Sequence, residues 1–229
     1  MFIRIFKLQT LPKTNATMKK ALFVLMANFL FVCMCSSQQA GTNGLPKSKK
    51  AQAGKVVKDI QTTSHGKPSF MFKPVQRAAK IYNLDDLENG YDSLQIRIWC
   101  DYSAKTTQLI LVKLAAQRYS CQRFSFYNVN DYGFFGAKAL PYSVVNLMPK
   151  SGWPIFLNKL LDLDISTLRG NNWGADGVIY FVEVATAKKY RFYTYWSPEI
   201  MAKNDPGSKN MAAILAMLEK ECAFHRLYQ

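Results

Sequence analysis

The sequence predicts a single α+β domain, in which a mainly antiparallel sheet of five or six strands carries a connecting helix and a carboxy-terminal helix packed on one face. Three observations predict this fold. Apolar and polar residues alternate along both arms of residues 176–196, which is typical of a β-hairpin. Three more strand-like segments lie close together between residues 94 and 127, as in an antiparallel meander. The first alternates, and the second is nearly continuous in apolar residues, as expected of a more central strand. Residues 208–222 repeat apolar side chains at helical spacing.

The chain divides into three parts by composition. Residues 1–35 have the layout of a secretory signal, because Met18-Lys19-Lys20 precedes the apolar run ALFVLMANFLFVCMC and polar residues follow it. The run is shorter than the about 20 apolar residues that a membrane span needs, and Met18 is an alternative start. Residues 36–67 are rich in Lys, Ser and Gly without an apolar period, which predicts a flexible tether. Residues 68–229 form the predicted domain.

Cys33 and Cys35 at the end of the apolar run resemble the lipidation site of bacterial lipoproteins. In that family an aliphatic residue lies three positions before the lipidated cysteine, and a small residue lies just before it. The aliphatic residue is Leu30 for Cys33 and Val32 for Cys35. The residue just before each cysteine, Val32 or Met34, is larger than the family's pattern. The resemblance implies a lipid anchor, with Cys35 preferred because two serines follow it. Cleavage at a small residue beyond the run would instead give a soluble exported protein.

The positive charge is concentrated at the amino-terminal end. Of the formal net charge of +15, residues 1–35 and 36–67 contribute +5 each, which leaves +5 for residues 68–229. The predicted domain is therefore only mildly basic, and membrane insertion and solvation account for most of the excess. We expect no nucleic-acid partner.

The first elements of the predicted domain are a helix and a turn. Residues 75–82 fit a short amphipathic helix, with Pro74 acceptable in its first turn. The acidic segment 85–92 predicts a turn before a strand. It lacks the alternating ligands and the terminal glutamate of a calcium-binding loop, so we predict no metal there.

A meander of three strands follows, and it bears on the cysteines. The strands are predicted at residues 94–101, 108–114 and 119–127. The apolar phase changes between Cys121 and Phe124, which predicts a bulge near Gln122. Cys100 and Cys121 would lie on the outer strands, about 9 to 10 Å apart and beyond disulfide reach. The five cysteines of the chain therefore predict buried thiols and no disulfide framework.

The remaining predicted elements are a short strand, the connecting helix, the hairpin and the final helix. Residues 143–147 predict a short strand within a Gly- and Pro-containing segment. Ser151 is the predicted N-cap of the connecting helix, with Pro154 in the first turn. The hairpin follows, and the final helix starts at Ser208 or Asn210.

No catalytic, cofactor or metal motif is present. The candidate carboxylates are Asp101, Asp131, Asp176 and Glu183. No two of them share a spacing that forces a pair, whereas glycosidase-type chemistry requires a positioned pair. The two histidines, His65 and His225, are not placed near a cysteine by any motif. We therefore assign no catalytic, cofactor-binding or metal-binding residue.

The second arm of the hairpin interleaves cations with aromatic rings, which can stack on bases or sugars. The candidate interaction surface consists of Lys188, Lys189, Arg191, Tyr193 and Tyr195. The alternative is that one set of rings packs inward and that lysine and arginine stems cover the other set.

Motifs along the second half of the chain carry a family resemblance. Between Ser151 and Pro198 lie SGW, then F and LL, then DG, and then EVATAKKYRFYTYWSP, while SLQIRIW occupies Ser93–Trp99. This arrangement resembles a family of uncharacterised exported proteins of Gram-negative bacteria, with SLQIRIW similar to the family's first strand. The resemblance implies export and supplies no activity, cofactor or site residue.

These observations predict an exported protein of the cell envelope, held to the membrane by a lipid anchor. We expect a non-catalytic binding or interaction module whose partner is an envelope protein or polymer. Two alternatives stay open: a hydrolase acting on an envelope polymer, and an inhibitor or immunity protein. The oligomeric state is not predicted.

Overall fold

The computed structural model describes residues 55–101, 106–127, 143–171, 174 and 177–224. All of them belong to one compact unit, residues 47–229. The predicted signal, both candidate lipidation cysteines and His225 lie outside the described residues. Within the described part of the chain, every helix is too short or too polar to cross a membrane.

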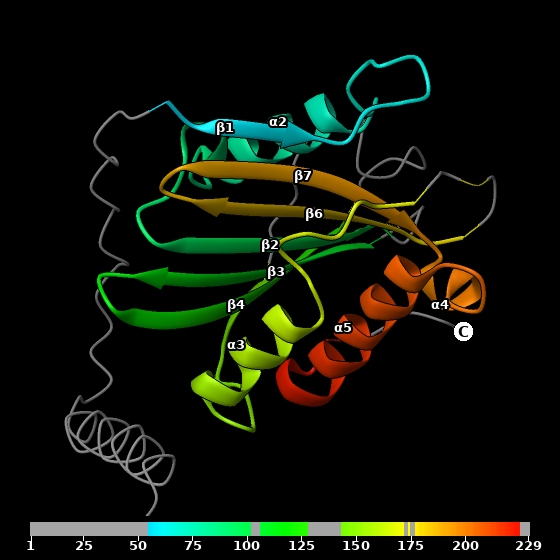
Figure 1. Ribbon diagram of the computed structural model, residues 1–229. Coiled ribbons are helices and arrows are strands. Elements are labelled where there is room, and N and C mark those ends of the chain that lie inside the picture. The colour runs from blue at the N-terminus through cyan, green and yellow to red at the C-terminus, as the bar shows by residue number, and fades with distance from the viewer. Residues whose placement is uncertain (1–54, 102–105, 128–142, 172–173, 175–176, 225–229) are drawn as a thin grey trace, which may run out of the picture. The chain divides into compact units, whose positions relative to one another are not determined.

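The unit is built on one mixed sheet of seven strands (Figure 1). The strands are β1 (Val57–Ile60), β2 (Leu94–Asp101), β3 (Thr106–Ala115), β4 (Arg118–Tyr127), β5 (Ser143–Leu147), β6 (Ile179–Thr186) and β7 (Lys189–Trp196). Their order across the sheet is β1-β7-β6-β2-β3-β4-β5, with β1 parallel to β7 and every other pair antiparallel. The α+β class is confirmed. The predicted count of five or six strands is too low by the edge strand β1.

The predicted hairpin and meander are both present. β6 and β7 pair directly, from Ile179 opposite Trp196 to Ala185 opposite Tyr190. β6 also pairs with β2, so the hairpin and the meander join into one sheet. The two groups of strands therefore share two continuous faces.

Strand β1 corrects the predicted tether. Val57–Ile60 pairs with β7, with Val57 opposite Lys189 and Ile60 opposite Phe192. The prediction of a flexible tether over residues 36–67 is therefore wrong for its last part, while residues 36–54 lie outside the described residues. Only Ile60 is half-buried in this strand, so four residues at a sheet edge produce almost no apolar period.

Helices cover both faces of the sheet, where the sequence predicted cover on one face. Helices α3 (Trp153–Asp162) and α5 (Pro206–Cys222) pack on one face, and the short helix α4 (Pro198–Met201) precedes α5. Helix α2 (Phe72–Ile81) and the 3-10 turn η1 (Leu87–Asn89) pack on the other face. Figure 1 shows α3 and α5 in front of the sheet and α2 behind it.

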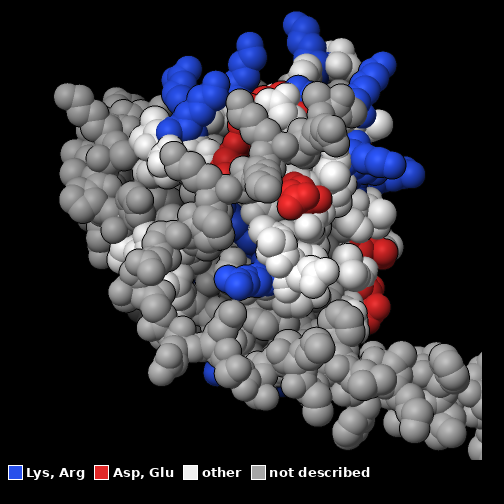
Figure 2. Space-filling model, turned by 90° about the vertical axis from the view of Figure 1, so that its left-hand side faces the viewer, with Lys and Arg blue, Asp and Glu red and all other residues white. Residues whose placement is uncertain are grey.

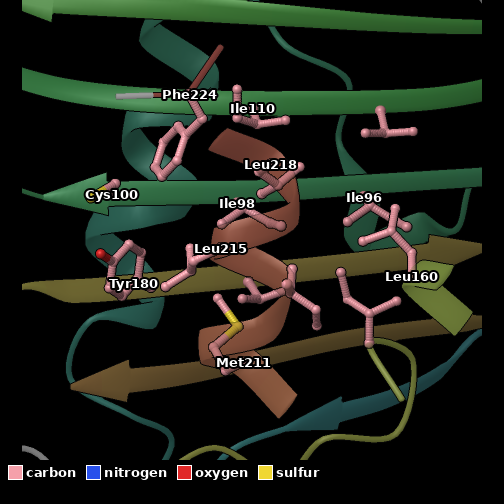
Figure 3. Close-up of a cluster of buried hydrophobic side chains, with 14 of the residues drawn as sticks. Ile96, Ile98, Cys100, Ile110, Leu160, Tyr180, Met211, Leu215, Leu218 and Phe224 are labelled. Atoms are coloured by element: carbon pink, nitrogen blue, oxygen red, sulfur yellow. The ribbon is translucent and has the colours of Figure 1, made fainter. Parts of the chain in front are cut away.

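Each face has its own hydrophobic core. The α5-side core includes Ile96, Ile98, Ile110, Val112, Met211, Leu215 and Leu218. Figure 3 shows these α5 side chains lying between the helix and the strands. The α2-side core includes Trp99, Leu109, Leu111, Phe181, Phe192, Val75 and Ala79. Because both faces are buried, residues of both phases along the central strands are apolar.

This two-sided burial explains why the predicted bulge is wrong. β3 and β4 pair without interruption through Gln122, which lies opposite Leu111. Cys121 belongs to the α5-side core, and Phe124 belongs to the α2-side core. The change of apolar phase marks two buried faces and not an extra residue.

Both helix starts differ from prediction. Ser151 does not cap α3; Gly152 precedes the helix with a φ of 80°, and the Ser151 N–H donates to Glu221 Oε2 at 2.7 Å. Helix α5 starts at Pro206, earlier than predicted. Its N-cap is Asp205, whose carboxylate accepts from the Gly207 N–H at 3.3 Å and the Ser208 N–H at 2.7 Å.

Candidate functional site

The five residues of the predicted interaction surface do not form one surface. Lys188 and Lys189 are exposed, while Arg191 is 7% exposed and Tyr193 and Tyr195 are each 1% exposed. The two tyrosines belong to the α5-side core. Tyr193 and Tyr195 therefore pack inward, as the alternative expected. The other ring set differs from that alternative, because Tyr190 and Phe192 belong to the α2-side core and are not covered by lysine and arginine stems. Burial raises the pKa of Tyr195 to about 12, so this phenol stays neutral at physiological pH.

Three of these residues nevertheless line a pocket at the β1–β7 edge. The pocket has a volume of about 360 Å³. It is lined by Asp59, Gln61, Thr167, Arg169, Lys189, Arg191, Phe192 and Tyr193. The lining residues come from β1 and the residues just after it, from β7, and from the segment that follows α3.

Arg191 is held in place by all three of these segments. Its Nε donates to Asp59 Oδ2 at 2.7 Å, its Nη1 to the Ser166 carbonyl at 2.5 Å, and its Nη2 to the Leu168 carbonyl at 2.9 Å. The guanidinium also lies 5.5 Å from the ring centroid of Tyr193. Arg191 therefore presents a fixed positive charge at the floor of the pocket.

Gln61 joins the segment after β1 to β7 and to the segment after α3 by hydrogen bonds. Gln61 Oε1 accepts from the Thr194 N–H at 2.6 Å and from the Thr194 hydroxyl at 2.8 Å, and its Nε2 donates to the Asn171 carbonyl at 3.2 Å. Gly170 lies beside this contact with a φ of +79°, and a Cβ there would come within 2.6 Å of the Thr194 carbonyl oxygen. Only glycine fits at this position.

The pocket is positively charged. Arg169, Lys189 and Arg191 face a single acid, Asp59, whose Oδ2 also lies 3.8 Å from Lys189 Nζ. Basic side chains continue along this edge of the sheet, because residues 55–82 contain six Lys and Arg and one Asp. Figure 2 shows lysine and arginine side chains along the upper rim of the molecule, at the level where Figure 1 places β1 and α2. Such an edge attracts anions.

Of the four candidate carboxylates, the structure describes the side chain of Glu183 alone. Asp131 and Asp176 lie outside the described residues, and of Asp101 only the backbone at the end of β2 is described. Glu183 is completely buried. Glu183 lines neither of the two pockets found among the described residues.

Glu183 lies in a polar network under α2. Its carboxylate accepts from Gln76 Nε2 and Trp99 Nε1 at 2.9 Å each, and from the Tyr190 hydroxyl at 3.0 Å. Arg97 Nη1 lies 3.5 Å from Glu183 Oε2, and both side chains are 0% exposed. Burial, together with the Glu183 charge, raises the pKa of Tyr190 and keeps its hydroxyl a donor. The carboxylate is surrounded by protein donors, so its role is structural.

A second pocket lies between α3 and α5, with a volume of about 420 Å³. Its charged residues are Lys159, Asp162, Lys220 and Glu221, two of each sign. Glu221 is 4% exposed and already accepts from the Ser151 N–H. This pocket offers no charge selectivity.

The described residues contain no group of three His, Cys, Asp or Glu side chains that could hold a metal ion. The sequence interpretation missed Asp59 and Gln61, because both fell within the predicted tether. The signal was weak: Val56, Val57 and Ile60 are the apolar residues of an otherwise polar stretch.

Comparison of the chain with protein-family models, curated proteins and solved structures finds no match. The resemblance to a family of exported proteins stays a prediction.

Proposed function

We propose that this chain is an exported, envelope-tethered binding protein without catalytic activity, and that the β1–β7 pocket holds an anionic group of its partner. The observation that carries this proposal is the convergence of Arg169, Lys189 and Arg191 on one pocket with a single acid. The partner is an envelope polymer or protein that bears phosphate or carboxylate groups.

The pocket combines a fixed cation with movable ones. An arginine side chain has five N–H donors, and the three hydrogen bonds of Arg191 leave two for a ligand. The fixed guanidinium loses little conformational entropy on binding. Lys189 has a side chain 48% exposed, and Arg169 is also exposed, so both can move toward a bound anion.

The test is a titration of the full-length protein with two polyanions, inorganic polyphosphate and alginate, and with neutral dextran. The Arg169→Ala variant should bind the recognised polyanion about tenfold more weakly, the effect of about 1.4 kcal/mol from one charged contact. Arg118→Ala, which removes an exposed arginine outside the pocket, is the matched control and should bind as the wild type does. Equal affinities of the two variants would contradict the proposal.

The Asp59→Asn variant should change the affinity for the polyanion in the direction opposite to that of Arg169→Ala. The amide oxygen can still accept from Arg191, while the negative charge that opposes an anion is removed. This variant should bind the polyanion more tightly, and raising the salt concentration should reduce the gain. Damage to the fold would weaken binding in both variants, so the opposite signs separate electrostatics from instability.

We also propose export with a lipid on Cys35 or, second, on Cys33. Mass spectrometry of the mature amino terminus from the native host should show a diacylated cysteine at one of these positions. An intact, uncleaved amino terminus would overturn the proposed export and lipidation.

The two alternative functions have their own tests. Release of fragments from an envelope polymer by the protein would favour the hydrolase alternative, and inhibition of a partner enzyme would favour the inhibitor alternative.

A further inference from the structure

Two buried cysteines from distant parts of the chain lie against one another. Cys121 is on β4 and is 1% exposed, and Cys222 is the last residue of α5 and is 2% exposed. Both belong to the α5-side core, and their thiols share a hydrogen bond. No disulfide joins them in the structure.

A neighbouring contact shows independently that β4 and the end of α5 meet here. Arg123, two residues after Cys121 on the same strand, donates from Nη1 to the carbonyl of Ala223, the residue after Cys222. Ala223 caps the helix in the left-handed conformation with a φ of 46°. The backbone on both sides of the thiol pair is thus held in place.

The third described cysteine is not a partner for Cys121. Across the meander, Cys121 lies opposite Val112, which lies opposite Ile96 on β2. Cys100 is four residues farther along β2, which adds about 13 Å along the strand to the width of two strand spacings. The sequence-based conclusion that these two cysteines do not bond agrees with this register, although their separation is larger than predicted.

We propose that Cys121 and Cys222 are the site of a disulfide that forms in an oxidising environment and joins the end of α5 to β4. The cross-link would close a segment of about 100 residues, and a disulfide restricts the unfolded chain more strongly the longer the segment that it closes. Formation of this disulfide in the host rests on the proposed export, since disulfides persist in the oxidising compartments outside the cytosol. Oxidation of the purified protein does not depend on export.

The chemistry is thiol–disulfide exchange with a small disulfide such as oxidised glutathione. The Cys222 thiolate attacks one glutathione sulfur, forms a mixed disulfide and releases one glutathione thiolate. Cys121 then loses its proton and attacks the Cys222 sulfur, which forms the protein disulfide and releases the second glutathione. Two protein thiols are oxidised, one glutathione disulfide is reduced, and the two protons pass to the released glutathiones.

The hydrogen bond between the thiols favours this order of events. It lowers the pKa of Cys222 and raises the pKa of Cys121, because the Cys121 S–H donates to the Cys222 sulfur and stabilises the Cys222 thiolate. Cys222 is therefore the thiol that ionises first. Its position in the last turn of α5 also allows exposure by local opening of the helix end.

The experiment treats purified full-length protein with oxidised and reduced glutathione, blocks remaining thiols with N-ethylmaleimide in denaturant, and maps the tryptic peptides. Trypsin separates Cys121 in residues 119–123, Cys222 in residues 221–226 and Cys100 in residues 98–105. Oxidation should link residues 119–123 to residues 221–226 and leave Cys100 blocked. It should also raise the urea midpoint of unfolding by about 1 M, and reduction should reverse the shift.

Two variants decide the outcome. Cys222→Ser should abolish both the linked peptide and the shift in midpoint. Cys100→Ala, which removes another buried thiol of the same core, should keep both. Three results would overturn the proposal. All thiols could still react with N-ethylmaleimide after glutathione treatment, the linked peptide could include Cys100, or the oxidised form could unfold at a lower urea concentration than the reduced form. If the link forms in vitro while protein trapped from the host is reduced, the proposed export fails and the disulfide site stands.

Discussion

Replacing Glu183 with alanine tests the structural role of the buried polar network. The carboxylate accepts hydrogen bonds from Gln76, Trp99 and Tyr190 and pairs with Arg97 at 3.5 Å. Its removal takes one acceptor from each of these donors. The Arg97 guanidinium, which is 0% exposed, keeps its hydrogen bond to the Asp85 carbonyl and loses its counter-charge. Breaking a buried ion pair on one side costs about 3 to 5 kcal/mol. A domain of this size is stable by about 5 to 15 kcal/mol, so the variant should lose a large part of its stability.

Urea unfolding followed by tryptophan fluorescence measures this loss, since Trp99 is in the network. With a slope of about 2 kcal/mol per M, the midpoint should fall by about 1.5 to 2.5 M. Glu88→Ala is the matched control, because Glu88 pairs with Lys58 at 2.8 Å with side chains 30% and 44% exposed. This exposed pair should contribute less than about 1 kcal/mol.

A double variant separates charge from packing. In Arg97→Met/Glu183→Leu both charges are removed and apolar side chains of similar size replace them, which is often neutral or stabilising for a buried pair. The double variant should therefore be more stable than Glu183→Ala alone. A Glu183→Ala midpoint that falls no more than that of Glu88→Ala would contradict the structural role of the network. A double variant less stable than Glu183→Ala would contradict it too.

Two further predictions concern the ends of elements. Hydrogen bonding from Ser208 lowers the pKa of the Asp205 carboxyl, so its cap on α5 stabilises the fold above the ordinary aspartate pKa and is lost as the pH falls. Asp205→Ala should cost about 1 kcal/mol at pH 7, and the difference from the wild type should shrink in acid, as followed by urea unfolding across pH. Gln61→Ala leaves the N–H of Thr194, a residue 8% exposed, without its acceptor and should cost about 1 to 3 kcal/mol. Hydrogen exchange along β1 should accelerate, whereas Gln122→Ala, which removes an exposed side-chain hydrogen bond, should leave it unchanged.

The sequence predicted two cations of the candidate site but not the acidic residue that pairs with them. Lys189 and Arg191 were recognised from the interleaving of cations and rings, a pattern within eight residues of chain. Their acidic partner Asp59 lies 132 residues from Arg191 in the sequence, on a strand too short to show a period. No local pattern connects the two residues. The pocket therefore became visible only when β1 was placed beside β7.

The sequence by itself determined the elements whose periods are local. Alternation at period two specified the hairpin and the first strand of the meander, and apolar repeats at helical spacing specified α5, because these patterns state which side chains share a face. A nearly continuous apolar run specified the middle strand of the meander. They do not state what covers that face. The tertiary structure decided that helices cover both sides of the sheet, which buried Arg97 with Glu183 and turned Tyr193 and Tyr195 into core residues. It also brought Cys121 to Cys222, since contacts across about 100 residues depend on topology and not on the residues between them.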